Sequence, residues 1–122
     1  MFKNIKSLVY EKNLTLYSKE YFELEINENR NILKYKDNMN NNKIENVNDE
    51  LVMEYFDHLF RIIDDWKDKY EDNSMIDGIE WQLQIIYKNG KIKKYCGKSE
   101  FPRNFEYLDK IKNEMINKID GD

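Results

Sequence analysis

Hydrophobic and polar positions alternate along this chain with two different periods. In residues 21–26 one face carries Phe22, Leu24 and Ile26 and the other carries Tyr21, Glu23 and Glu25, which is typical of a half-buried strand. Residues 5–10, 14–17 and 32–36 have the same β-rich character and predict three further strands. The asparagine-rich stretch 37–48 predicts a loop.

A helical period follows over residues 49–70. Asn48 suits the N-cap, and the acidic residues Asp49 and Glu50 suit the positive end of the helix dipole. Apolar side chains form a stripe along one side of the predicted helix, namely Val52, Phe56, Leu59, Ile63, Trp66 and Tyr70. We therefore expect one long amphipathic helix with this stripe in the core.

Residues 79–98 alternate again around Asn89-Gly90, a strong signal for a β-hairpin. A two-residue loop there would pair Leu83 with Cys96, so that Cys96 shares the packed face with Trp81. Pro102 and Asn104 then introduce a last helix with an apolar stripe from Phe105 to Ile119.

These elements predict a single α+β domain over residues 1–122, in the order β-β-β-β-α-β-β-α. Strands and helices that are each apolar on one face bury those faces against one another. We expect a two-layer fold, with an antiparallel sheet and two helices packed on one face.

Composition narrows the class of protein. The 122 residues include nine Tyr, six Phe and two Trp, enough aromatic side chains for a folded core. No apolar run is long enough to cross a membrane, and the first residues lack the apolar core of a signal peptide. With one cysteine and one histidine, the sequence predicts a cytoplasmic protein without disulfide, cofactor or metal site.

The candidate catalytic groups are sparse. Cys96 would need a histidine to activate it, and His58 is expected on the polar side of the long helix. Glu54 and His58 have the i, i+4 spacing of paired metal ligands, but the neighbouring Arg61 disfavours a cation there. We therefore expect a protein that is not an enzyme.

Acidic side chains gather on the polar side of the predicted long helix. The candidate interaction face consists of Glu50, Glu54, Asp57, Asp64, Asp65 and Asp68. Such a face favours a non-catalytic, accessory role with a basic protein partner, by analogy with acidic immunity proteins that neutralise basic nuclease toxins. Homo-oligomers stay open, and a membrane is not expected as a partner.

Two other functions remain as alternatives. A gap between sheet and helices lined by Trp66 and Trp81 would form an aromatic pocket for a small molecule, either as a binding domain or as a weak enzyme. The lysines of the hairpin, Lys88, Lys91 and Lys93, would form a basic face with Tyr95 for single-stranded nucleic acid. The net charge of −4 disfavours nucleic acid.

The order of motifs also resembles a family of small bacterial domains of the low-G+C type. The resemblance rests on "YFELEI" followed by "LKY", on Trp66 and Tyr70 at the end of a helix, on "DGIEWQLQIIYKNGKIKKYCG" and on "FPRNF". It covers residues 21–119 and implies an α+β fold and a bacterial cytosolic origin. It implies no activity, and no functional residue follows from it.

Overall fold

The computed structural model describes residues 4–15, 18–37, 42–71 and 79–120. Within these residues, seven strands form one sheet in the order β4-β3-β2-β1-β6-β7-β5. The strands are β1 (Ile5–Thr15), β2 (Ser18–Ile26), β3 (Asn31–Lys36), β4 (Asn42–Val47), β5 (Lys69–Glu71), β6 (Glu80–Tyr87) and β7 (Ile92–Lys98). Neighbouring strands are antiparallel, except that β5 runs parallel to β7.

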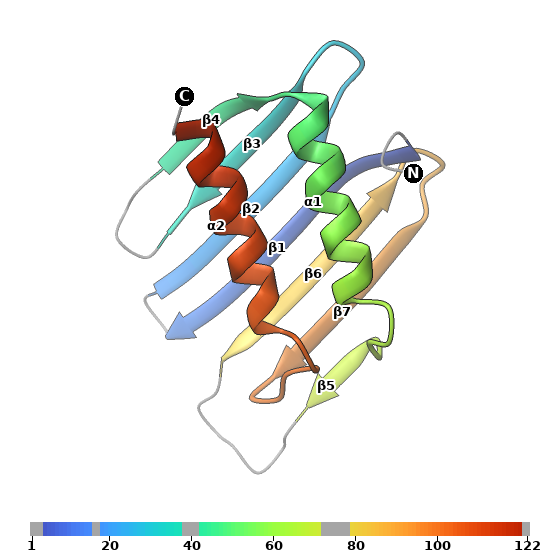
Figure 1. The fold of residues 1–122 in the computed structure, drawn as a ribbon. Helices are drawn as coiled ribbons and strands as arrows, with labels where there is room; N and C mark the ends of the chain where they lie inside the picture. The colour runs from blue at the N-terminus through green and yellow to red at the C-terminus, as the bar shows by residue number, and fades with distance from the viewer. Residues whose placement is uncertain (1–3, 16–17, 38–41, 72–78, 121–122) are drawn as a thin grey trace.

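Helices α1 (Asp49–Ile62) and α2 (Glu106–Asp120) both cover the same face of this sheet (Figure 1). The predicted fold class, a two-layer α+β domain with both helices on one face, is confirmed. The core lies between the layers, where Leu8, Leu24 and Leu83 from the sheet meet Leu59 and Leu108 from the helices. The opposite side, here called the open face, is covered by neither helix.

The elements along the chain differ from the prediction in three places. Residues 5–15 form one strand instead of two, and β4 lies in the stretch predicted as an asparagine-rich loop over 37–48. Residues 38–41 of that stretch lie outside the described residues. The third difference is β5, which overlaps the end of the helix predicted over residues 49–70.

Helix α1 begins as predicted, because the side chain of Asn48 accepts a hydrogen bond of 2.9 Å from the Leu51 N–H. It ends at Ile62 rather than at residue 70. Asp64 and Asp65 follow the C-cap, and aspartate favours turns over helix interiors because its side chain competes for backbone hydrogen bonds. Trp66 is therefore not on the helix, although it is buried as predicted.

The hairpin between β6 and β7 has a loop of three residues, not two. The Gly90 N–H donates to Tyr87 O, and the Tyr87 N–H donates to Lys91 O, so Tyr87 and Lys91 flank the loop. Gly90 has a φ of +92°, as a three-residue loop with a glycine bulge requires. The register is thus one residue from the prediction: Leu83 pairs with Tyr95, and Cys96 pairs with Gln82.

This shift exchanges the two faces of β7. Tyr95 enters the core with 6 % of its surface exposed, whereas Cys96 lies on the open face beside Gln82. The expected position of Cys96 on the packed side with Trp81 is wrong.

Candidate functional site

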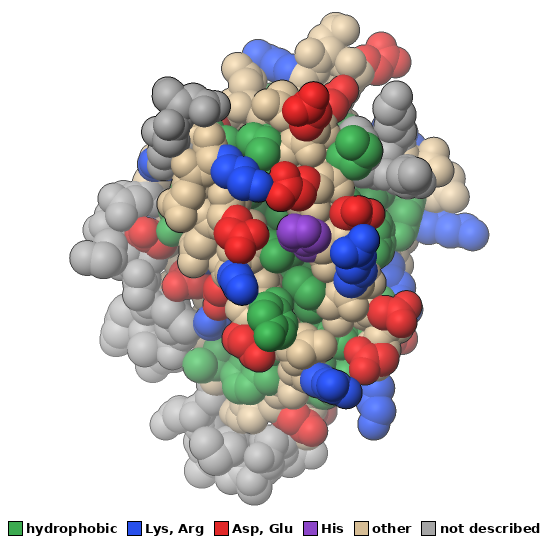
Figure 2. Space-filling view, in the orientation of Figure 1, with side chains coloured by type: hydrophobic (Ala, Val, Ile, Leu, Met, Phe, Trp, Pro, Cys, Tyr) green, Lys and Arg blue, Asp and Glu red, His purple; other side chains and the backbone are tan. Residues whose placement is uncertain are grey.

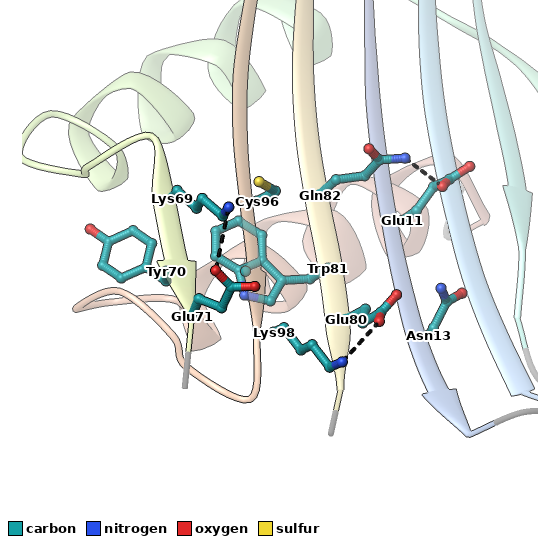
Figure 3. Close-up of a pocket in the computed structure, with 11 residues that line it drawn as sticks. Glu11, Asn13, Lys69, Tyr70, Glu71, Glu80, Trp81, Gln82, Cys96 and Lys98 are labelled. Carbon is teal, nitrogen blue, oxygen red and sulfur yellow. Dashed lines mark hydrogen bonds and ion pairs between the residues drawn. The ribbon is translucent and has the colours of Figure 1, made fainter. Parts of the chain in front are cut away.

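A hollow of about 330 Å³ lies on the sheet where β5, β7, β6 and β1 run side by side (Figure 3). We call it the open-face pocket. It is bounded by three carboxylates, two ammonium groups and two amides, from Glu11, Glu71, Glu80, Lys69, Lys98, Asn13 and Gln82. Its volume falls within the range of small-molecule sites in proteins.

Strand pairing brings these residues together from distant parts of the chain. Lys69 lies opposite Cys96, Cys96 opposite Gln82, and Gln82 opposite Glu11, so one row of side chains crosses four strands. Directly opposed residues of paired strands project to the same side of the sheet. The pocket therefore depends on the tertiary pairing of segments up to 85 residues apart, from Glu11 to Cys96.

The charged groups of the pocket are paired with one another at its surface. Lys69 Nζ lies 3.3 Å from Glu71 Oε2, and Lys98 Nζ lies 3.9 Å from Glu80 Oε1. Gln82 Nε2 donates to Glu11 Oε2 over 2.7 Å. All four ion-paired side chains are at least 40 % exposed, and pairs of this kind contribute only about 0–1 kcal/mol each to stability. They can therefore exchange partners with little loss.

Trp81 and Tyr70 pack beneath the pocket, on the core side of the sheet, because both lie opposite Gly97. Trp81 reaches from β6 across Gly97 of β7, as Figure 3 shows, and its Nε1 donates to Glu100 O over 3.0 Å. Tyr70 of β5 packs beside it with ring centroids 6.2 Å apart. Because Gly97 has no side chain, the two rings meet across the strand.

The predicted pocket between Trp66 and Trp81 is not formed. The two indoles pack against each other with centroids 5.7 Å apart, and Phe105 and Tyr95 fill the space around Trp66. Trp66 Nε1 donates to Arg103 O over 2.8 Å, which satisfies the indole inside the core. Of the two tryptophans only Trp81 lines the open-face pocket.

The predicted acidic face divides into two groups. Glu50, Glu54 and Asp57 lie on α1, whereas Asp64, Asp65 and Asp68 follow its end. Basic side chains lie among them on this side of the molecule (Figure 2), and three pairs are formed, Glu54–Lys118 at 2.6 Å, Asp57–Arg61 at 3.7 Å and Asp68–Lys93 at 3.0 Å. The hydrogen bond from Lys118 lowers the pKa of Glu54. A single acidic helix face is thus absent from the described residues.

The predicted basic face of the hairpin is also divided. Lys93 and Tyr95 project to the helix side, where Lys93 hydrogen-bonds Asp68 and this bond raises the pKa of the lysine. Lys88 and Lys91 lie at the exposed hairpin end. The structure does not bring the three lysines together with Tyr95 on an outward face, because the register of β7 differs by one residue.

Cys96 and His58 lie on opposite sides of the sheet. His58 is on α1 beside Ile111 and Glu114 of α2, and Cys96 is on the open face. The expectation that they do not meet is correct, although for a different reason than predicted. Among the described residues, no group of three or more His, Cys, Asp and Glu side chains is arranged to hold a metal ion.

A half-buried charge cluster beneath α2 was missed from the sequence. Asp109 accepts hydrogen bonds from Lys12 at 3.1 Å and Lys112 at 3.4 Å, and Lys112 also lies 3.7 Å from Glu20. The side chain of Lys112 is only 7 % exposed. These charges join α2 to β1 and β2, and we assign them a structural role.

None of the helices in the described part of the chain has the length and apolar character needed to cross a bilayer. No protein-family model matches this chain, and neither does any curated protein sequence. The resemblance to small bacterial domains therefore stays a prediction, and the function is argued from the site alone.

Proposed function

We propose that this chain is a small, non-catalytic binding domain of the cytosol, and that it binds a zwitterionic ligand in the open-face pocket. The observation that carries this proposal is the pocket of about 330 Å³ on the side of the sheet that neither helix covers. A ligand there would contact side chains from four strands at once.

The residues that line the pocket favour a ligand that carries one positive and one negative group. Carboxylates of Glu71 and Glu80 stand beside ammonium groups of Lys69 and Lys98. A carboxylate of the ligand can replace Glu80 as the partner of Lys98, and its ammonium group can then pair with Glu80. Amino acids and short peptides carry these two groups at a suitable separation.

A non-catalytic role is supported by the surroundings of Cys96. The single histidine of the chain faces α2 on the other side of the sheet, so it is not available to Cys96 as a base. The carboxylates around the pocket are engaged by lysine and glutamine side chains. Binding needs only an exchange of these partners.

The thiol of Cys96 provides a direct test, because it is the only cysteine and it lines the pocket. We would measure its reaction with a disulfide reagent in the presence of the standard amino acids and a dipeptide panel. A bound ligand should slow the reaction several-fold. The matched control is Cys96→Ser with Gln84→Cys, which moves the thiol to the neighbouring strand β6, on the same face of the sheet but outside the pocket lining.

Binding by the pocket also predicts a pattern among charge variants. Lys98→Ala and Glu80→Ala should each weaken protection, whereas Lys94→Ala, on the same face but outside the pocket lining, should not. If no compound protects Cys96, or if the control thiol is protected equally, the pocket is not the binding site. Chemical conversion of a panel member, detected by mass spectrometry, would refute the non-catalytic role.

A further inference from the structure

The edge strand β4 lies at the end of the sheet farthest from the open-face pocket. It pairs with β3 on one side, and no other described element lies along its outer edge (Figure 1). An exposed edge strand presents unpaired backbone N–H and C=O groups that can pair with another strand. This strand is six residues long, twice the length of β5 at the opposite edge.

Ile44 makes this edge apolar at its centre. It is 74 % exposed, the most exposed of the large hydrophobic side chains among the described residues. Val47 of the same strand is buried on the helix side, so the alternation along β4 places Ile44 on the open face and Lys43 and Glu45 on the helix side. Nothing within the described part of the chain covers Ile44.

The sequence of β4 is complementary to itself in one antiparallel register. Two copies related by a two-fold axis can pair their β4 strands and so extend one sheet. Directly opposed residues of the two strands must project to the same side of the sheet. The residue at the axis is therefore opposed by the same residue of the other copy. An axis at Lys43 would oppose two lysines, and an axis at Glu45 would oppose two glutamates. An axis at Ile44 instead opposes Ile44 with Ile44, and Lys43 with Glu45 twice.

We propose that the chain forms a homodimer in which β4 pairs antiparallel with β4 of a second copy, centred on Ile44. The sheet then continues across both copies, and all four helices lie on one side. Each exposed isoleucine is covered by the other, and both free edges gain hydrogen bonds. The open-face pocket lies at the β5 side of each copy, so this proposal does not depend on the ligand.

The experiment is sedimentation equilibrium of the full chain over a wide concentration range. The wild type should associate to a dimer, and Ile44→Lys should be monomeric at the same concentrations. Ile92→Lys is the matched control, since Ile92 is 60 % exposed on the open face of β7. It should leave the dimer intact.

A charge exchange tests the register. Lys43→Glu places like charges opposite each other on both sides of the central Ile44 pair and should weaken dimerisation by about tenfold or more. Adding Glu45→Lys restores opposite charges and should recover most of the affinity. Lys43 also takes part in an interaction within its own chain. The single and the double variant both lose that interaction, so the difference between their dimerisation affinities reports the contact between the two copies.

Circular dichroism and urea unfolding of every variant would verify that each is folded. A wild-type monomer at all concentrations would overturn the proposal, as would equal dissociation by Ile92→Lys. A dimer that Ile44→Lys abolishes but the double charge exchange fails to restore would overturn the register centred on Ile44.

Discussion

The indole of Trp81 occupies the space that a side chain at Gly97 would need. A Cβ atom on Gly97 would lie 2.6 Å from Trp81 Cε2 and 2.7 Å from Glu100 O. Real Cβ atoms do not approach other heavy atoms so closely, and here the obstacles are a packed ring and a backbone carbonyl. The packing of Trp81 beneath the open-face pocket therefore requires glycine at this position of β7.

Gly97→Ala should lower the free energy of unfolding by about 1–3 kcal/mol, the usual effect of overpacking a well-packed site. Urea unfolding followed by tryptophan fluorescence would measure it. The adjacent variant Lys98→Ala, which alters the opposite side of the strand, should change stability by less than about 0.5 kcal/mol. Equal stability of Gly97→Ala and the wild type would mean that Trp81 moves aside without loss.

Tyr10→Phe should leave stability unchanged or raise it by about 1 kcal/mol. The hydroxyl of Tyr10 is buried and has no hydrogen-bond partner in the described structure, and an unpaired buried polar group is unfavourable. The ring is needed, because it packs edge-on against Phe105 at 6.3 Å. Tyr10→Leu should therefore destabilise the protein in the same unfolding assay, and a clear loss of stability in Tyr10→Phe would contradict the prediction.

Asp109→Asn should destabilise the protein by about 2 kcal/mol, since it removes the charge that accepts hydrogen bonds from Lys12 and Lys112. Lys112 would then keep Glu20 as its only carboxylate partner among those described at this cluster. Adding Lys12→Met should recover part of the loss, because one of the two cations of the cluster is removed with it. Calorimetry of the wild type, the two single variants and the double variant gives the coupling, and purely additive effects would argue against a shared cluster.

Stability should fall as the pH rises above about 10. Burial raises the pKa of Tyr10 and Tyr55 well above the usual tyrosine value, and it raises the pKa of Tyr35 to about 12. Below pH 10 these tyrosines are neutral in both states, whereas above it only the unfolded chain loses their protons. Tyr10 and Tyr55, which are both buried, then each lower the free energy of unfolding by about 1.4 kcal/mol per pH unit.

Urea unfolding between about pH 9 and pH 11 would measure this slope, and tyrosinate absorbance would follow ionisation in the folded state. Tyr55→Phe should reduce the slope by the contribution of one proton. If the stability of the wild type is constant over this range, the buried tyrosines ionise equally easily in both states.

The fold class could be predicted because alternation reports burial directly. Phe22, Leu24 and Ile26 face the core as their spacing indicates, and so do Trp81, Leu83 and Ile85. The helix start at Asn48 was also predictable, since a cap is a local hydrogen bond. The end of the helix could not be predicted. Ile63 and Trp66 have helical spacing and are both buried, but Trp66 reaches the core from the segment that follows the helix.

The hairpin register shows why the site could not be predicted. Both a two-residue loop and a three-residue loop need a residue with positive φ, and Gly90 meets that need in either loop. The Asn89-Gly90 dipeptide therefore does not fix the loop length. The residues of β7 do not decide between the two loops, because Tyr95 and Cys96 are both suited to burial. One residue of register decides whether Cys96 faces the core or the pocket, and β5 has only three residues with no strand pattern of their own.

The parallel pairing of β5 with β7 sets an order of assembly. β5 pairs with the sheet only through β7, with Lys69 opposite Cys96, and β7 is itself paired with β6, so we expect the hairpin of β6 and β7 to form before β5 docks. Local hairpins close faster than pairings between distant segments. The outer wall of the open-face pocket is thus the last part to dock and the first to open, and amide hydrogens of residues 69–71 should exchange with solvent ahead of those in β6. A ligand that contacts both β5 and β7 would hold the two strands together. It would slow hydrogen exchange at residues 69–71 and leave the exchange rates of the central strands unchanged.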